Sequence, residues 1–167
     1  MGKTCCIDVD GVLNSYPQAW LKFLSARGYS YSTLEQAKTG LAYDGYTQLK
    51  HMYRRSPEKR FQPPRQGAAG FTYSLADMGY TVIIKTSRPI QEHPHLVGWT
   101  HDWLREHGFT FKETLFNRHN PAKALSTYPD LAFIVDDNRE QVDLFNSHGV
   151  QAFLFDGDYR KILEALK

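Results

Sequence analysis

The sequence predicts an α/β fold: a doubly wound, Rossmann-like parallel sheet of about five strands, with a small helical insertion after the first strand. Length is the first of three supporting observations, because 167 residues suit one domain of ordinary size. Composition is the second, since 41% hydrophobic and 23% charged residues are typical of globular proteins and exclude wholesale disorder. The third is an alternation of short apolar runs with helical patterns, which favours a parallel sheet covered by helices on both faces.

Short apolar runs predict five strands, at residues 5–9, 81–84, 114–116, 131–135 and 150–155. Helical patterns lie between and after them, at residues 68–78, 96–107, 121–127, 139–148 and 159–166. Three of these helices are followed at once by glycine, a common residue just past a helix end. Right-handed crossovers then wind the helices over both faces of the sheet. In such folds, ligands bind at the carboxyl ends of the strands.

The segment of residues 15–67 separates the first predicted strand from the next strand-and-helix unit. A helix is expected after Pro17, a capping box at residues 32–35, and another helix at residues 46–54. Residues 56–64 contain three prolines and are predicted to return to the core in an extended conformation. The predicted organisation is therefore a core of residues 1–14 and 68–167 with a small helical cap of residues 15–67.

Charge is divided unevenly between the two predicted parts. The cap segment holds 9 Lys and Arg against 3 Asp and Glu, a net charge of +6, whereas the whole chain has a net charge of only +2. The same segment carries 9 of the 23 aromatic residues. A basic, tyrosine-rich segment beside an acidic remainder favours an anionic substrate with an aromatic or sugar part.

Two features of the sequence bear on the cellular location of the protein. No uninterrupted apolar stretch approaches the roughly 20 residues that a membrane span needs, so no membrane partner is expected. The two cysteines, Cys5 and Cys6, are adjacent on a predicted strand and point to opposite faces, so they do not form a stapling disulfide. That usage favours a reducing, cytoplasmic location. The oligomeric state is not predicted.

Polar residues gather where three of the predicted strands end. They are Asp8, Asp10, Thr86, Ser87, Arg88, Asp136 and Asp137, with Lys123 in the short helix before the fourth strand. Because parallel strands end at one edge of the sheet, these side chains are expected to converge. Crowded carboxylates repel one another and need a cation, and an oxygen-only ligand set suits Mg²⁺ best. Taken singly, each motif is also compatible with a solvated turn, a helix cap or a surface lysine.

The set Asp8-x-Asp10-Gly11-Val12, Thr86, Lys123 and Asp136-Asp137 resembles the four motifs of the haloacid dehalogenase (HAD) superfamily of phosphohydrolases. The motifs occur in the family's order, and the insertion falls where the family places a cap. The resemblance implies that Asp8 is a nucleophile that forms an aspartyl-phosphate. It further implies that Asp10 is the general acid and base, and that Lys123 neutralises charge on Asp8 and on the phosphoryl group.

The resemblance also implies the binding residues. Thr86 would hydrogen-bond the phosphoryl group with the Ser87 backbone N–H nearby. Gly11, and Arg88 from its position beside Thr86 at the mouth of the site, are also expected to contact substrate. The implied Mg²⁺ ligands are Asp8, the carbonyl of Asp10, Asp136 and Asp137.

Three hypotheses on function stay open at this point. The run of residues 63–69 is weakly similar to the 5′(3′)-deoxyribonucleotidase branch of the superfamily, which favours a nucleotide as the small phosphorylated substrate. The basic cap suits instead a phosphatase of nucleic-acid ends, such as a 3′-phosphate. A third hypothesis is a non-catalytic module that binds nucleic acid or a protein partner.

Overall fold

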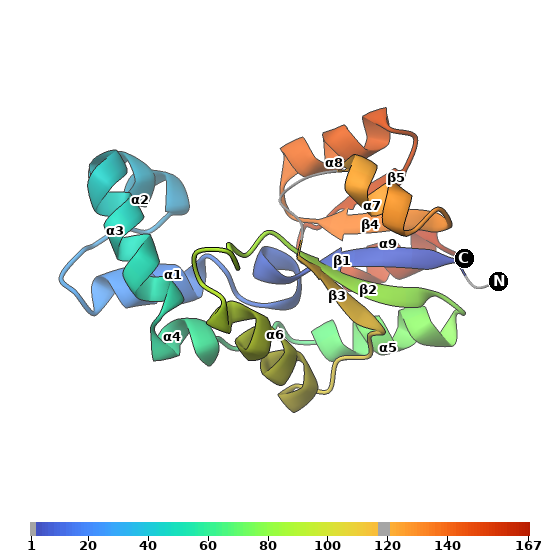
Figure 1. Cartoon of the computed structure of the whole chain (residues 1–167), viewed down its shortest axis with the longest axis horizontal. Helices are drawn as coiled ribbons and strands as arrows, with labels where there is room; N and C mark the ends of the chain where they lie inside the picture. Colours follow the sequence, from blue (N-terminus) through green and yellow to red (C-terminus); the bar gives the residue numbers. More distant parts are fainter. Residues whose placement is uncertain (1–2, 117–120) are drawn as a thin grey trace.

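The computed structural model describes residues 3–116 and 121–167 and contains one parallel sheet with strand order β3-β2-β1-β4-β5 (Figure 1). The strands are β1 (Thr4–Asp8), β2 (Thr81–Thr86), β3 (Glu113–Phe116), β4 (Leu131–Asp136) and β5 (Gln151–Leu154). All four strand pairs are parallel. Each strand lies within one or two residues of its prediction, so the predicted sheet is confirmed.

Helices cover both faces of this sheet, as the alternation of strands and helices predicts. One face packs on α5 (Ala68–Asp77), α6 (His95–Glu106) and α9 (Tyr159–Ala165), and the other on α7 (Pro121–Thr127) and α8 (Arg139–Ser147). Successive residues of β1 serve different faces, since Cys5 joins the first hydrophobic cluster and Cys6 the second. Both cysteines are buried and free. The doubly wound α/β class is therefore confirmed.

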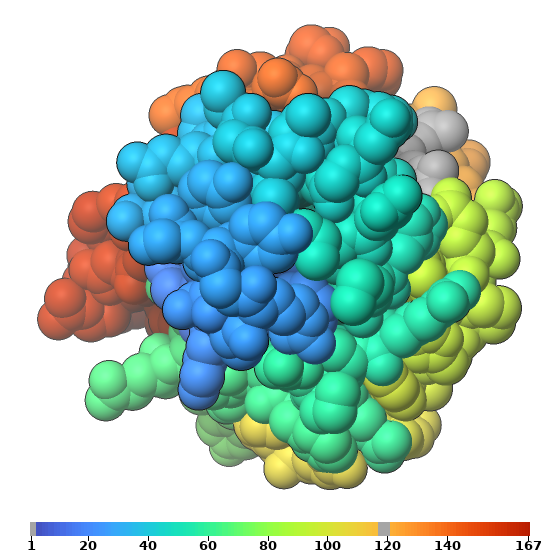
Figure 2. Space-filling view, turned by 90° about the vertical axis from the view of Figure 1, so that its left-hand side faces the viewer, coloured from blue at the N-terminus to red at the C-terminus, as the bar shows by residue number. Residues whose placement is uncertain are grey.

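β1 is followed by the single π-helical turn η1 (Val9–Leu13), and four α-helices then make up the insertion before α5. They are α1 (Gln18–Ser25), α2 (Leu34–Gly40), α3 (Ala42–Arg54) and α4 (Pro57–Arg60). The first three bury a hydrophobic cluster of their own around Trp20, Phe23 and Tyr53. The cap covers the carboxyl edge of the sheet, and its blue-to-teal residues fill the centre of that side of the molecule (Figures 1 and 2). The exact division at residues 15 and 67 stays a prediction.

The two ends of the insertion are joined to each other. An isolated antiparallel bridge pairs Asn14 with Pro64, and the Arg65 N–H donates to the Leu13 carbonyl at 2.9 Å. The Ser15 N–H donates to the Pro63 carbonyl at 3.3 Å. The chain thus leaves the core and returns to it through two segments that lie side by side.

Two local predictions within the cap are wrong, and a third is confirmed only in part. The helix cap predicted at Ser32 is made one residue later, because the Thr33 hydroxyl accepts from the Gln36 N–H at 3.1 Å. The helix predicted at residues 46–54 begins earlier, at Ala42. The return segment is not wholly extended, since Ser56 caps the one-turn helix α4 with Pro57 at its first position.

In the part of the chain that the structure describes, every helix is too short or too polar to cross a membrane.

Candidate active site at the carboxyl edge of the sheet

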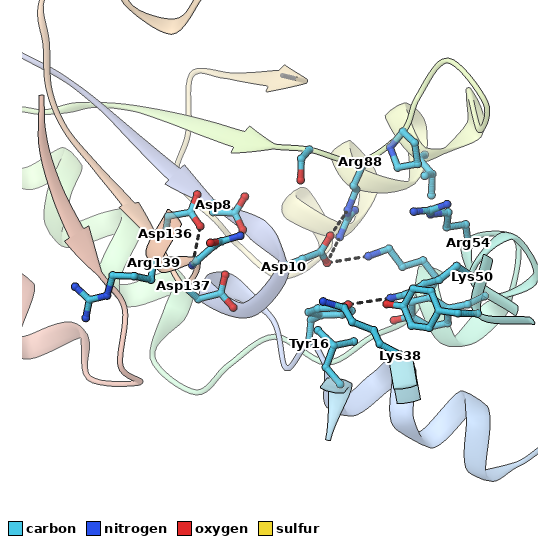
Figure 3. Close-up of a pocket in the computed structure, with 18 residues that line it drawn as sticks. Asp8, Asp10, Tyr16, Lys38, Lys50, Arg54, Arg88, Asp136, Asp137 and Arg139 are labelled. Carbon is cyan, nitrogen blue, oxygen red and sulfur yellow. Dashed lines mark hydrogen bonds and ion pairs between the residues drawn. The ribbon is translucent and has the colours of Figure 1, made fainter. Parts of the chain in front are cut away.

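Three carboxylates meet where β1 and β4 end side by side. Asp8 is the last residue of β1, Asp136 is the last of β4, and Asp137 follows it. Each of the three offers an oxygen within 4.8 Å of the others'. Figure 3 shows the group at one end of a cavity. The predicted convergence of these residues is therefore present in the structure.

Two hydrogen bonds orient the Asp136 carboxylate. The Asn138 N–H donates to Oδ1 at 2.9 Å, and Lys85 Nζ donates to Oδ2 at 2.9 Å. Asn138 in turn caps α8, because its side chain accepts from the Glu140 N–H. The start of α8 thus holds the end of β4 in place.

Burial and mutual repulsion disfavour the ionised form of these carboxylates when no cation is bound. Burial, followed by the neighbouring Asp136 carboxylate, raises the pKa of Asp8 well above its usual range. The same two causes raise the pKa of Asp137 to about 6. Mg²⁺ fits this site, because all three ligands are carboxylate oxygens that can approach a common point.

Gly11 makes room for Asp137. It lies in the wide turn Val9–Leu13 that follows β1, with φ at +100°, a conformation that favours glycine. A Cβ atom at this position would lie 1.9 Å from Oδ2 of Asp137. Gly11 is buried and does not line the cavity, so the structure gives it a packing role, while the predicted contact with substrate stays a prediction.

Asp10 lies apart from the other carboxylates and faces the cap (Figure 3). Its Oδ1 accepts from Lys59 Nζ at 2.8 Å and from Arg88 Nη2 at 3.0 Å, while Oδ2 accepts from Arg88 Nε at 3.1 Å. Asn14 Nδ2 adds a bond of 2.7 Å to Oδ1. Burial alone would raise the pKa of Asp10, but the Arg88 and Lys59 charges hold it well below its usual range.

Lys59 and Arg88 come to Asp10 from different parts of the chain. Lys59 belongs to α4 of the cap, whereas Arg88 follows β2 in the core. Arg88 lines the cavity but is only 7% exposed, and its Nη1 donates to the Thr100 hydroxyl at 2.7 Å, so it lies within the site rather than at its mouth. Its predicted contact with substrate stays a prediction. Ser87 also lines the cavity, while Thr86 is buried beside it and accepts from the Arg88 N–H at 3.4 Å.

The lysine nearest the carboxylates is Lys85. It is 1% exposed and faces Asp8 across the β1–β2 register. Burial alone would lower its pKa, but the Asp8 and Asp136 charges raise it. Lys123, which the sequence predicts for this role, is exposed on α7 and does not line the cavity.

Sequence reasoning missed Lys85 and Lys59. Lys85 interrupts the apolar strand Thr81–Thr86, and a charged residue in a buried strand needs a charged partner, which is the signal that could have found it. No comparable signal marks Lys59, which lies in a run of charged residues.

A cavity of about 550 Å³ joins the core carboxylates to the cap. Its cap side is lined by aromatic and basic residues: Tyr16, Lys38, Tyr46, Lys50, Tyr53, Arg54 and Lys59. The site therefore has an acidic end on the sheet and a cationic end on the cap.

No protein-family model matches the sequence, and no curated protein matches it. Solved structures nevertheless share its fold. A predicted phosphatase from Clostridium acetobutylicum aligns with a TM-score of 0.64 at 12% identity, over 95% of this chain and 87% of that chain. A predicted phosphoglycolate phosphatase from Haemophilus somnus 129pt gives a TM-score of 0.62 at 16% identity, over 99% and 98%.

A chain of the Pnkp1/Rnl/Hen1 RNA repair complex gives a TM-score of 0.55 at 15% identity, over 93% of this chain and 42% of that chain. The fold of this protein is therefore shared with solved structures that are described as hydrolases and phosphatases, which agrees with the fold that the motifs imply. The weaker resemblance to deoxyribonucleotidases is not confirmed by these structures.

Proposed function

We propose that the protein is a Mg²⁺-dependent phosphomonoesterase that acts through an aspartyl-phosphate on Asp8. One observation carries the proposal: Asp8, Asp136 and Asp137 place carboxylate oxygens within 4.8 Å of one another at the floor of a cavity. The phosphatases with which the chain shares its fold support the reaction class.

The three carboxylates would hold the ion, together with the Asp10 carbonyl that the family resemblance implies. Bound there, Mg²⁺ would offset the negative charge of the phosphoryl group. Lys85 contributes a second, fixed positive charge at the same place, because it contacts Asp136 and faces Asp8. Lys123 stays a candidate for this role from the motif alone.

Asp8 supplies the nucleophile. Its carboxylate oxygen bonds to phosphorus as the ester P–O bond breaks, and the leaving oxygen takes a proton from Asp10. Asp10 then takes a proton from the water that hydrolyses the acyl phosphate. Since Lys59 and Arg88 favour the ionised form of Asp10, substrate binding must weaken these ion pairs before Asp10 donates its proton.

A nucleotide is the substrate we favour. Tyr16 and Tyr46, both partly exposed, line the cap side of the cavity and offer aromatic surface for a base or sugar. A phosphatase of nucleic-acid ends is the second candidate, favoured by the basic cap and by the fold shared with the RNA repair complex.

A phosphate-release screen tests the proposal, with nucleoside monophosphates, sugar phosphates and oligonucleotides phosphorylated at the 3′ or 5′ end. We expect Mg²⁺-dependent release from mononucleotides with weak dependence on salt. A steep fall of kcat/KM with salt on oligonucleotides would favour the second candidate. Absence of release from every ester, together with unchanged ligand binding in Asp8→Asn, would favour the non-catalytic module.

A further inference from the structure

Basic residues of the cap line the end of the cavity that lies away from the core carboxylates. They are Lys38 on α2, Lys50 and Arg54 on α3, and Lys59 on α4, of which Lys59 donates to Asp10. Among the described residues that line the cavity, all of the carboxylates come from the core. Figure 3 shows Lys50 and Arg54 on the far side of Asp10 from Asp8, with Lys38 beside Tyr16.

Lys50 lies in an aromatic enclosure rather than in an ion pair. Its Nζ donates to the Tyr16 hydroxyl at 2.8 Å and lies 4.3 Å from the centre of the Trp20 ring and 4.6 Å from that of Tyr16. The ion pairs within 4.0 Å in the described ranges 3–116 and 121–167 include neither Lys50 nor Lys38.

An ammonium group in such surroundings is costly to keep charged. Burial, and then the nearby Lys59 and Arg54 charges, lower the pKa of Lys50 to about 6. An anion placed beside Lys50 would reverse this cost, because it would offset both the burial and the repulsion between the cations.

We infer that Lys38, Lys50 and Arg54 form a subsite for a second phosphoryl group, so that the preferred substrate carries two phosphates, one removed at Asp8 and one held by the cap. The inference rests on the proposed function. A second phosphomonoester suits the subsite better than a carboxylate, because it brings a charge of about −1.5 to −2 to the end of the cavity that Lys38, Lys50 and Arg54 line.

The test measures binding without turnover, by calorimetry on the Asp8→Asn variant with Mg²⁺. The probes are thymidine 3′,5′-bisphosphate, each of the two thymidine monophosphates, and the phosphorylated dinucleotide pTpT. We expect the bisphosphate to bind at least about tenfold more tightly than either monophosphate, which corresponds to about 1.4 kcal/mol. Tighter binding of pTpT than of the bisphosphate would place the second phosphate in a nucleic-acid strand.

Substitutions then show which residues produce the preference for the bisphosphate. Adding Lys50→Met should reduce the preference for the bisphosphate about tenfold, and adding the exposed Lys38→Met should reduce it severalfold without risk to the cap interior. Lys22→Met, which removes an exposed charge from α1 outside the cavity, is the matched control and should preserve the preference. Equal affinity for bisphosphate and monophosphates, or a preference that survives both Lys50→Met and Lys38→Met, would overturn the inference.

The outcome is independent of catalysis. If the unmodified protein releases no phosphate from any probe, the proposed function fails, while the calorimetric preference still decides whether the subsite exists.

Discussion

Lys85 Nζ lies 2.9 Å from Oδ2 of Asp136, although the two residues belong to strands on opposite sides of β1. The lysine side chain therefore reaches across the end of β1, where Asp8 lies. Removing one partner of a buried ion pair leaves the other charge uncompensated, which typically costs about 3–5 kcal/mol. This arrangement distinguishes Lys85 from Lys123 as the fixed cation of the site.

Lys85→Met should lower kcat by about 10²-fold or more, since a preorganised charge at the reacting group contributes on that scale. The melting temperature of the Lys85→Met variant should fall further below that of the unmodified protein in EDTA than in Mg²⁺, because the ion can replace part of the missing charge. Lys123→Met is the matched comparison and should have a smaller effect on kcat. A larger fall in kcat in Lys123→Met than in Lys85→Met would assign the fixed positive charge of the site to Lys123.

Asp8→Asn should abolish measurable turnover, because an amide does not form the acyl phosphate. The variant should fold, and its melting temperature in EDTA should match or exceed that of the unmodified protein, since a neutral amide relieves repulsion with Asp136. Phosphate release and thermal unfolding measure the two effects. Substantial residual release from purified Asp8→Asn would identify another nucleophile.

Metal removal should silence the enzyme reversibly, and added Mg²⁺ should restore activity. Mg²⁺ should also raise the free energy of unfolding, by about 2.7 kcal/mol at 100 times its Kd. Because the pKa of Asp137 is raised to about 6 in the ion-free site, protons compete with the ion below that pH. Mg²⁺ affinity should therefore fall as the pH is lowered from 7 to 5, which titration calorimetry measures. Full activity in EDTA would exclude the metal assignment.

Lys59→Gln should move the alkaline limb of the kcat/KM profile to higher pH. The Arg88 and Lys59 charges hold the pKa of Asp10 down, so removing one of them lets that pKa rise. Asp10 must be protonated to act as the general acid, and a higher pKa keeps it protonated to higher pH. An unchanged limb in a folded Lys59→Gln protein would argue against Asp10 as the acid. Lys22→Gln serves as the control for loss of one cap charge.

Gly11→Ala should destabilise the protein by about 1–3 kcal/mol, because it combines an unfavourable φ with a collision against Asp137. It should also weaken Mg²⁺ binding, since Asp137 must move away to admit the new Cβ. Thermal unfolding and calorimetry measure both effects. Normal stability together with normal Mg²⁺ affinity would show that the turn adapts at little cost.

Most of the core was predictable because its signals are local. Apolar runs, glycines past helix ends and polar residues after the strands each depend on a few neighbouring residues, and the structure places the strands, the core helices and Asp8, Asp136 and Asp137 as predicted. The cap was less predictable: α4 is a single turn, too short to show a helical period, and α3 begins after Leu41, which packs against the cluster around Trp20 and Tyr53.

The sequence by itself determined the α/β class, the order of the motifs, and the convergence of Asp8, Asp136 and Asp137, because parallel strands end at one edge whatever fills the space around them. Only the tertiary structure decided which cations stand beside the carboxylates, namely Lys85 at Asp136 and Lys59 with Arg88 at Asp10. A long flexible side chain can reach several partners, and the partner it takes depends on burial and on charges from segments far away in the chain.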